Sequence, residues 1–145
     1  MRLSAGFKTF LVVLGIFVVL MVAGALFPQP SGSERTKRAH ARFDANHLAV
    51  GLMAYREEYG QFLKGELPHI ITTLTGDNPR KIVFIEVEPK SLNAKGEFVD
   101  PWGTPYKILP QPNERLPRLV GVYSCGKNRE DEHGAESSDD LVSWR

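Results

Sequence analysis

The clearest pattern of apolar and polar positions in the chain lies between Phe43 and Phe62. Apolar side chains recur there three and four residues apart, which places them on one face of an α-helix. They are Leu48, Leu52, Tyr55 and Tyr59, with Phe43, Val50 and Ala54 flanking the same side. Gly60 follows, as a glycine just past the end of a helix commonly does. The pattern predicts an amphipathic helix that ends before Gly60 and carries the core of a small domain.

A second pattern occupies residues 10–27, where eighteen consecutive residues carry no charge. As a helix this segment is about 27 Å long, close to the roughly 30 Å of a bilayer's hydrocarbon core. It predicts a single membrane-spanning helix, with residues 1–9 as a short leader before it. A cleaved secretory signal is the competing interpretation, because small residues at 23–25 suit a cleavage site, although Leu26 continues the apolar run.

Two prolines and a glycine separate the apolar run from the amphipathic helix, in residues 28–33 (PQPSGS). Prolines disfavour a helix on their N-terminal side. We therefore expect a hinge at 28–33, with Ser33 as the N-cap of the following helix. Residues 34–145 then form the folded domain.

Basic residues gather just after this expected hinge: Arg35, Lys37, Arg38 and Arg42. They lie within the counting window of the positive-inside rule, as do Arg2 and Lys8 before the span, so charge alone does not orient the N-terminus. The cluster is interpreted either as a solvated helix face or as a contact with anionic lipid headgroups.

The rest of the pattern predicts short elements joined by turns. A helix is expected at Leu67–Leu74, and strands at Ile82–Val87, Tyr106–Leu109 and Leu119–Ser124. A turn-rich connection joins the last two strands, which predicts an antiparallel pair lying on the amphipathic helix. The expected fold class is α+β, with the sheet followed by an acidic C-terminal loop.

Composition narrows the class of function. The length of 145 residues suits one domain, and 18 basic against 17 acidic residues give a net charge of +1. A nucleic-acid-binding domain usually carries a basic excess, so we expect no nucleic-acid partner. Cys125 has no second cysteine with which to form an internal disulfide. No serine, cysteine or histidine arrangement indicates a nucleophile with its base, so we expect no enzyme activity.

The segment 124–144 holds six acidic residues against two basic ones. Calcium prefers six to eight hard oxygen ligands from carboxylates, amides and backbone carbonyls. The loop has few apolar residues to fix its shape, and a bound cation would substitute for them. Its spacing does not match an EF-hand, and the alternative interpretation is a solvated acidic loop.

Three blocks of sequence between Asp44 and Trp144 resemble one family and occur in the family's order; the third is the C-terminal loop. The helix positions are Asp44, Leu48, Leu52, Tyr55, Arg56, Gly60 and Phe62, and they resemble the spine helix of type II secretion pseudopilins. Leu63 replaces the family's usual proline. The heptapeptide Asp100–Tyr106 (DPWGTPY) closely resembles the pseudopilin motif before the first long strand. Trp102 within it offers the large apolar area that a small domain needs to close its core.

The resemblance at the N-terminus is partial. Gly6 and Phe7 match the junction at which a prepilin peptidase cleaves the basic leader of pilin-like proteins. Lys8 is an unexpected charge, and Leu11 stands where the family has a glutamate. In the family that glutamate is thought to pair with the amino terminus of a neighbouring subunit.

The resemblance also implies a calcium site in the C-terminal loop. The matching positions are the backbone carbonyl of Cys125 and the side chains of Asn128, Asp139 and Asp140. Asn128 is neutral where the family has aspartate, and Ser138 stands at a position that is acidic elsewhere. Glu130, Asp131 or Glu136 would compensate for these changes.

The resemblance implies a structural, non-catalytic subunit of a type II secretion or type IV pilus-like filament. The apolar helix would sit in the inner membrane and the domain in the periplasm. The implied partners are other pilin-like subunits, of the same or another kind, and an inner-membrane assembly platform driven by a cytoplasmic ATPase. The alternative is a membrane-anchored periplasmic binding module outside any filament, which Leu11 and the prolines of 28–33 favour.

Overall fold

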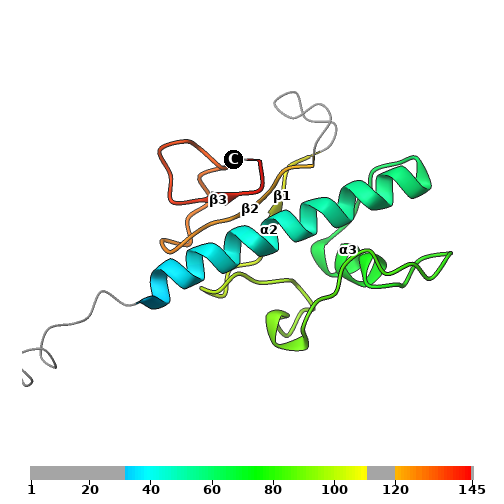
Figure 1. The fold of residues 1–145 in the computed structure, drawn as a ribbon, viewed down its shortest axis with the longest axis horizontal. Coiled ribbons are helices and arrows are strands. Elements are labelled where there is room, and N and C mark those ends of the chain that lie inside the picture. The colour runs from blue at the N-terminus through cyan, green and yellow to red at the C-terminus, as the bar shows by residue number, and fades with distance from the viewer. Residues whose placement is uncertain (1–31, 111–119, 145) are drawn as a thin grey trace, which may run out of the picture. The chain divides into compact units, whose positions relative to one another are not determined.

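The predicted amphipathic helix is the longest element among the residues that the structure describes. In the computed structural model, which describes residues 32–110 and 120–144, helix α2 spans Gly32–Tyr59 (Figure 1). It ends where the sequence predicts, because Gly60 takes a left-handed φ of 71° and its N–H donates to the carbonyl oxygen of Arg56 at 2.8 Å. The predicted N-cap is wrong, since helical structure includes Gly32 and Ser33 lies inside α2. The other residues of the expected hinge lie outside the described residues.

The buried face of α2 is narrower than the sequence pattern predicts. Leu48, Leu52 and Tyr55 are buried, as expected. Phe43 and Val50 are not on this face, because their exposed fractions are 66% and 64%. Val50 stands two residues from both Leu48 and Leu52, which turns it by about 200° around a helix of 3.6 residues per turn. Phe43 lies seven residues earlier and shares the outward direction of Val50.

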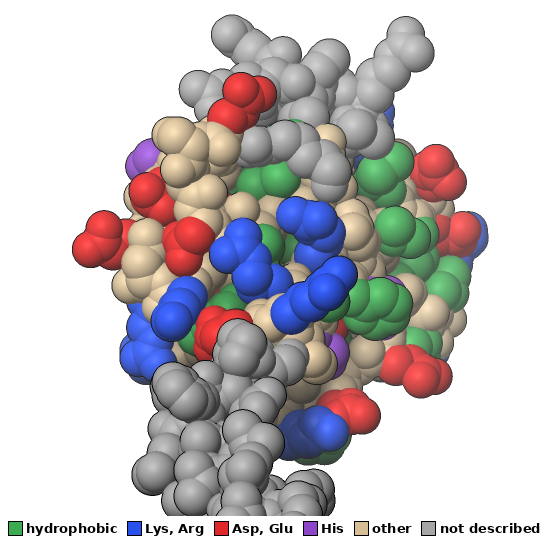
Figure 2. All heavy atoms as spheres, turned by 60° about the vertical axis from the view of Figure 1, so that its left-hand side comes forward, with side chains coloured by type: hydrophobic (Ala, Val, Ile, Leu, Met, Phe, Trp, Pro, Cys, Tyr) green, Lys and Arg blue, Asp and Glu red, His purple; other side chains and the backbone are tan. Residues whose placement is uncertain are grey.

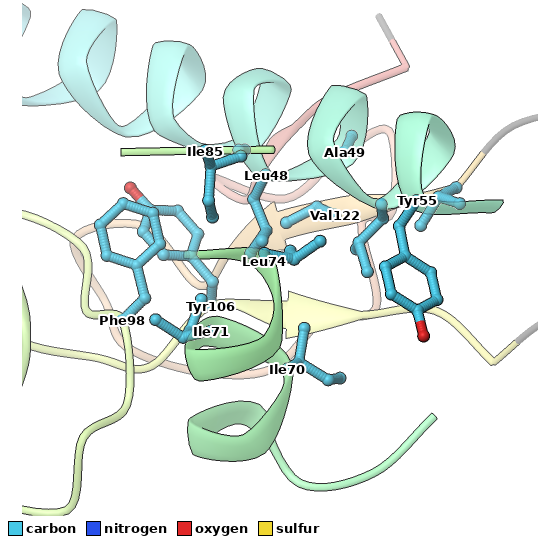
Figure 3. Close-up of a cluster of buried hydrophobic side chains, with 13 residues drawn as sticks. Leu48, Ala49, Tyr55, Ile70, Ile71, Leu74, Ile85, Phe98, Tyr106 and Val122 are labelled. Carbon is cyan, nitrogen blue, oxygen red and sulfur yellow. The ribbon is translucent and has the colours of Figure 1, made fainter. Parts of the chain in front are cut away.

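Helix α3 spans Leu67–Leu74, as predicted. It buries Ile70, Ile71 and Leu74. Figure 3 shows the Leu48 side chain of α2 reaching Leu74, with Ile71 beside Tyr106. The main core gathers buried side chains from both helices, the strands and the loops: Ala45, Leu48, Ala49, Leu52, Tyr55, Ile70, Ile71, Leu74, Ile85, Phe98, Tyr106, Val120 and Val122.

Three short strands form an antiparallel sheet in the order β1-β2-β3. They are β1 (Lys107–Ile108), β2 (Val122–Ser124) and β3 (Leu141–Val142). Tyr123 pairs with Lys107 on one side and with Val142 on the other. The predicted antiparallel pair is confirmed by β1 and β2, whereas β3 is not among the predicted strands. The fold is therefore α+β, a long helix packed on a small three-stranded sheet.

The segment Ile82–Val87 is not a strand, so that prediction is wrong. Its backbone binds the end of α3 instead, where the N–H of Phe84 donates to the carbonyl oxygen of Leu74 at 2.8 Å. Ile85 is buried, and it lies against α2 at Gly51 (Figure 3). Only Ile85 of this segment is buried, whereas Val83 is 56% exposed, so its β-branched content predicts neither a strand nor full burial. A 3-10 turn, η1 (Pro89–Ser91), follows it.

The predictions that concern the membrane fall on residues before Gly32. The leader 1–9 with its junction at Gly6 and Phe7, and the span 10–27, lie outside the described residues. Within 32–110 and 120–144, no helix combines the length and the apolar character needed to cross a bilayer.

The close approach of α2 to Ile85 generates a prediction for Gly51. A Cβ atom there would overlap the Cγ2 methyl of Ile85. We expect Gly51→Ala to lower the free energy of unfolding by about 1–2 kcal/mol, because overpacking outweighs the gain in helix propensity. Denaturant unfolding measures the change.

The control is a pair of variants at Asn46, an exposed position of the same helix. Asn46→Ala should be more stable than Asn46→Gly by about 1 kcal/mol, because helix propensity alone separates alanine from glycine where nothing packs on the side chain. A Gly51→Ala protein that is more stable than the wild type would contradict the packing of Ile85 on α2.

Candidate metal centre in the C-terminal loop

The acidic loop joins β2 to β3, so both of its ends are held by sheet pairing. The N–H of Ser143 donates to the carbonyl oxygen of Val122 at 2.9 Å. The N–H of Val122 in turn donates to Oγ of Ser143 at 3.0 Å. These two bonds close the base of the loop. Asp139 and Asp140 directly precede β3 and are therefore held at this base.

Three carboxylates meet in this loop. Glu132, Asp139 and Asp140 each offer an oxygen atom, and these atoms lie within 4.8 Å of one another. Asp140 is the most buried of the three, with an exposed fraction of 9%. Oδ1 of Asp139 and Oδ1 of Asp140 are both buried, and neither accepts a hydrogen bond from any residue that the structure describes. A buried carboxylate oxygen without a partner is costly.

The second oxygen of each aspartate is held by backbone amides. Oδ2 of Asp139 accepts hydrogen bonds from the N–H groups of Lys127, at 2.9 Å, and Asn128, at 3.2 Å. Oδ2 of Asp140 accepts one from the N–H of Gly134 at 2.7 Å. The amides therefore fix the direction of both carboxylates, and the two Oδ1 atoms accept no hydrogen bond from the described residues.

Two glycines with left-handed backbone make this close arrangement feasible. Gly126 has φ 66° and Gly134 has φ 67°. A Cβ at Gly126 would overlap Asp139, and one at Gly134 would overlap the ring of Trp144. Any side chain at either position would push the loop away from its carboxylates.

The pKa values of Asp140 and Asp131 are shifted in opposite directions. Burial raises the pKa of Asp140, and the carboxylates of Glu132 and Asp139 raise it further, against the hydrogen bond from Gly134. Burial also acts to raise the pKa of Asp131, but hydrogen bonds from the Tyr123 hydroxyl and a backbone N–H hold it below its usual range. Of these two acids, Asp140 is therefore the one whose surroundings disfavour the negatively charged form.

The structure brings together two of the predicted ligands. Asp139 and Asp140 lie in the carboxylate group, whereas the Asn128 amide donates from Nδ2 to Oε2 of Glu132 at 3.2 Å. Oδ1 of Asn128 accepts the N–H of Glu130 at 2.8 Å. Asn128 thus orients Glu132. Sequence reasoning missed Glu132 as a ligand, because no spacing rule separates it from the neighbouring acids.

Cys125 lies at the start of the loop and is buried. Burial raises the pKa of its thiol to about 11. A protonated thiol is a poor metal ligand. The expected contribution of Cys125 is its backbone carbonyl, which stays a prediction.

The donor set decides which ion suits the site. It consists of carboxylate oxygens, which are the ligands of Ca²⁺ and Mg²⁺. Histidine and cysteine ligands, which zinc and copper prefer, are absent from the groups found among the described residues. Three converging carboxylates, with two buried oxygens that have no partner among the described residues, are compatible with a hard cation such as Ca²⁺.

The DPWGTPY motif (residues 100–106) connects this loop to the rest of the domain. Asp100 is buried, and its Oδ1 accepts the N–H groups of Trp102, at 3.0 Å, and Thr104, at 2.9 Å. Its Oδ2 accepts the hydroxyl of Ser124 at 2.5 Å. Oγ of Ser124 accepts the N–H of Gly126 at 3.0 Å. A continuous chain of hydrogen bonds therefore runs from the motif into the first residues of the acidic loop.

The same motif also holds α2. The hydroxyl of Tyr106 lies 3.1 Å from Oδ2 of Asp44 and 3.3 Å from the carbonyl oxygen of Ala41. Trp102 packs in a second buried cluster with Ala41 of α2 and Leu141 of β3. Trp102 thus closes a core, as the sequence predicts, and links the long helix to the last strand.

Comparison with known protein families, curated proteins and solved structures gives no match for this chain. The likeness to pseudopilins therefore rests on the sequence motifs given above. The site itself is argued from the geometry of its own residues.

The Asp100 carboxylate generates a stability prediction. We expect Asp100→Ala to lower the free energy of unfolding by about 3 kcal/mol, because it leaves the N–H groups of Trp102 and Thr104 without their acceptor. Asp77→Ala is the matched control, since that side chain is exposed and its one ion pair within the described residues is with Lys81 at 3.4 Å. It should cost less than about 0.5 kcal/mol. Equal losses in urea unfolding would refute the bridging role of Asp100.

Proposed function

We propose that this chain is a membrane-anchored, non-catalytic structural subunit similar to the pseudopilins of type II secretion or type IV pilus-like filaments. In this proposal residues 10–27 lie in the inner membrane and the described domain lies in the periplasm. The observation that carries it is the DPWGTPY motif, which joins α2 to β3 and to the acidic loop. Such a domain presents a long helix on a small sheet and is suited to contact other proteins.

The outward face of α2 supports an assembly role. Phe43 and Val50 lie seven residues apart on this face and are among the large apolar side chains that the domain leaves exposed. Apolar side chains at that spacing can pack against a neighbouring helix. The partners in this proposal are other pilin-like subunits, an inner-membrane assembly platform and a prepilin peptidase that acts between Gly6 and Phe7.

The proposal includes Ca²⁺ as a structural ion of the C-terminal loop. Glu132, Asp139 and Asp140 would hold it through carboxylate oxygens, together with the backbone carbonyl of Cys125. The bound ion would supply positive charge to the two buried Oδ1 atoms. Asn128 would orient Glu132, and the backbone amides that bind Asp139 and Asp140 would keep both carboxylates aimed at the ion.

A second candidate is an anchored periplasmic binding module that never enters a filament. Leu11 and Lys8 favour it, because the family's glutamate is missing and a positive charge stands near the new N-terminus that cleavage would create. The two candidates share the anchor and the domain, and they differ in processing and in contacts between subunits.

The calcium proposal predicts a thermal shift in the purified full chain. We expect Ca²⁺ to raise the midpoint of unfolding relative to a chelator, by a stabilisation of about 2.7 kcal/mol when calcium is a hundredfold above its Kd. Asp140→Asn should abolish this gain and, in chelator, should match or exceed the wild-type stability, because the charge of Asp140 is disfavoured there. Asp131→Asn is the control and should lower stability equally with and without calcium.

The pH dependence follows from the raised pKa of Asp140. Without a cation, the folded state holds this proton more tightly than the unfolded state, so stability falls as pH rises through the carboxylate range. Calcium requires the ionised form, so its stabilising effect should shrink and then vanish as pH falls through the folded pKa of Asp140. A calcium effect that is absent at neutral pH, or that survives Asp140→Asn, would reject this site.

The filament proposal predicts the mature N-terminus and a contact between subunits. Mass spectrometry of the protein from its own cells should show a chain that begins at Phe7. Val50→Cys should cross-link to a neighbouring subunit, whereas Lys95→Cys, an exposed turn position, should not. An intact Met1 without cross-linking would favour the anchored binding module. A chain that begins near Leu26 would contradict the anchor.

A further inference from the structure

Three arginines form a stripe along the first turns of α2. Arg35, Arg38 and Arg42 are spaced three and four residues apart, which places them on one side of the helix, and all three are exposed. Lys37 lies between them in the sequence but on another side of the helix, because two residues correspond to a turn of about 200°, and it is half-exposed. Figure 2 brings the N-terminal end of α2 toward the viewer and shows Lys and Arg side chains gathered on this face.

The described part of the domain pairs none of these charges with an acidic side chain. None of the three arginines forms an ion pair with a carboxylate among the described residues. Other basic residues of the domain do, as Arg80 pairs with Glu58 and Lys90 pairs with Glu88. The stripe is therefore available to a partner outside the domain.

Arg35 lies in the first turn of the described helix, where a positive charge costs some stability. Positive side chains near a helix N-terminus oppose the partial positive charge of its free N–H groups. Basic residues would be better placed in the last turn of α2, where Arg56 stands. Three exposed arginines without a carboxylate partner among the described residues favour a role in binding an anion over a role in stability.

The sequence indicates which anion lies within reach. Arg35 is only eight residues beyond Phe27, the last residue of the apolar run. If that run spans a bilayer, as proposed above, such a short connection keeps the start of α2 near the layer of phosphate headgroups. Basic residues next to a membrane anchor bind anionic lipids, and each strengthens binding roughly fivefold.

We propose that Arg35, Arg38 and Arg42 dock the start of α2 on the anionic lipid headgroups of the membrane that carries the anchor. This inference rests on the proposed anchoring of residues 10–27. The arginines donate hydrogen bonds to phosphate oxygens and hold the domain close to the bilayer surface. Without these three arginines, residues 33–145 hold 13 basic and 17 acidic residues, a net charge of −4, so the rest of the domain does not compete for an anionic surface.

The test measures the distance between α2 and the headgroups in the full chain. A fluorophore is attached at Ala39→Cys, which labels selectively because Cys125 is buried and its thiol pKa is raised to about 11 by burial. The chain is reconstituted in phosphatidylcholine vesicles with or without phosphatidylglycerol, each carrying lipid with a spin-labelled headgroup. We expect strong quenching only with phosphatidylglycerol, and its loss in 1 M salt, where the screening length is about 3 Å.

Two triple variants separate the effect of the arginine stripe from the effect of the net charge. Replacing the three arginines by glutamine should lower quenching in phosphatidylglycerol vesicles to the phosphatidylcholine level. Lys64, Lys81 and Lys95 replaced by glutamine remove the same charge elsewhere and should leave quenching unchanged. Equal loss in both variants, or equal quenching in both kinds of vesicle, would overturn the docking. Quenching that requires an added acidic protein would overturn it as well.

Flotation of the same samples separates this inference from the proposed function. A chain that floats with phosphatidylcholine vesicles but shows no lipid-dependent quenching keeps its anchor and loses the docking stripe. A chain that floats only with phosphatidylglycerol, and only with its arginines, keeps the stripe and loses the anchor. A chain that floats with neither loses both.

Discussion

The buried carboxylate of Asp100 is the interaction on which the described domain depends. One of its oxygens accepts two backbone amides and shapes the turn of the DPWGTPY motif, and the other reaches Ser124 in the central strand. This turn places the Trp102 side chain against Ala41 and Leu141. One carboxylate side chain therefore sets the positions of the helix, the sheet and the loop relative to one another, because it satisfies polar groups that burial separates from water.

Asp100 and Asp140 show how buried acids can differ. Both oxygens of Asp100 accept hydrogen bonds, whereas Oδ1 of Asp140 lies buried without a described partner. Asp140 also faces two further carboxylates, and its pKa is raised by burial and by their charge. A domain that satisfies Asp100 so fully and leaves Asp140 unsatisfied is consistent with a cation at the second site. The proposal of a calcium-stabilised loop rests on this contrast.

Sequence reasoning succeeds where local rules act alone. The end of α2 at Gly60, the bounds of α3 and the β1–β2 pair follow from apolar spacing, a left-handed glycine and β-branched runs. It fails where long-range contacts decide. The segment Ile82–Val87 has the composition of a strand, but it lies against helices, and no local signal distinguishes the two kinds of burial.

The candidate site is predictable only in part for the same reason. Asp139 and Asp140 stand just before a strand, which a motif can capture. Glu132 joins them only because the loop folds back through left-handed glycines and because Asn128 bonds to it. The outward direction of Phe43 and Val50 is a different kind of error, because helical geometry alone is enough to show it.

Amide hydrogen exchange, measured by NMR on the full chain, tests the central claim most directly. If Asp100 holds helix, sheet and loop together, the amides of Trp102 and Thr104 exchange only through global unfolding, as slowly as the core of α2. Removal of calcium should then speed exchange at Lys127 and Gly134 while Trp102 and Thr104 stay protected. Fast exchange at Trp102 and Thr104 in the native protein, through local opening of the turn, would contradict the account.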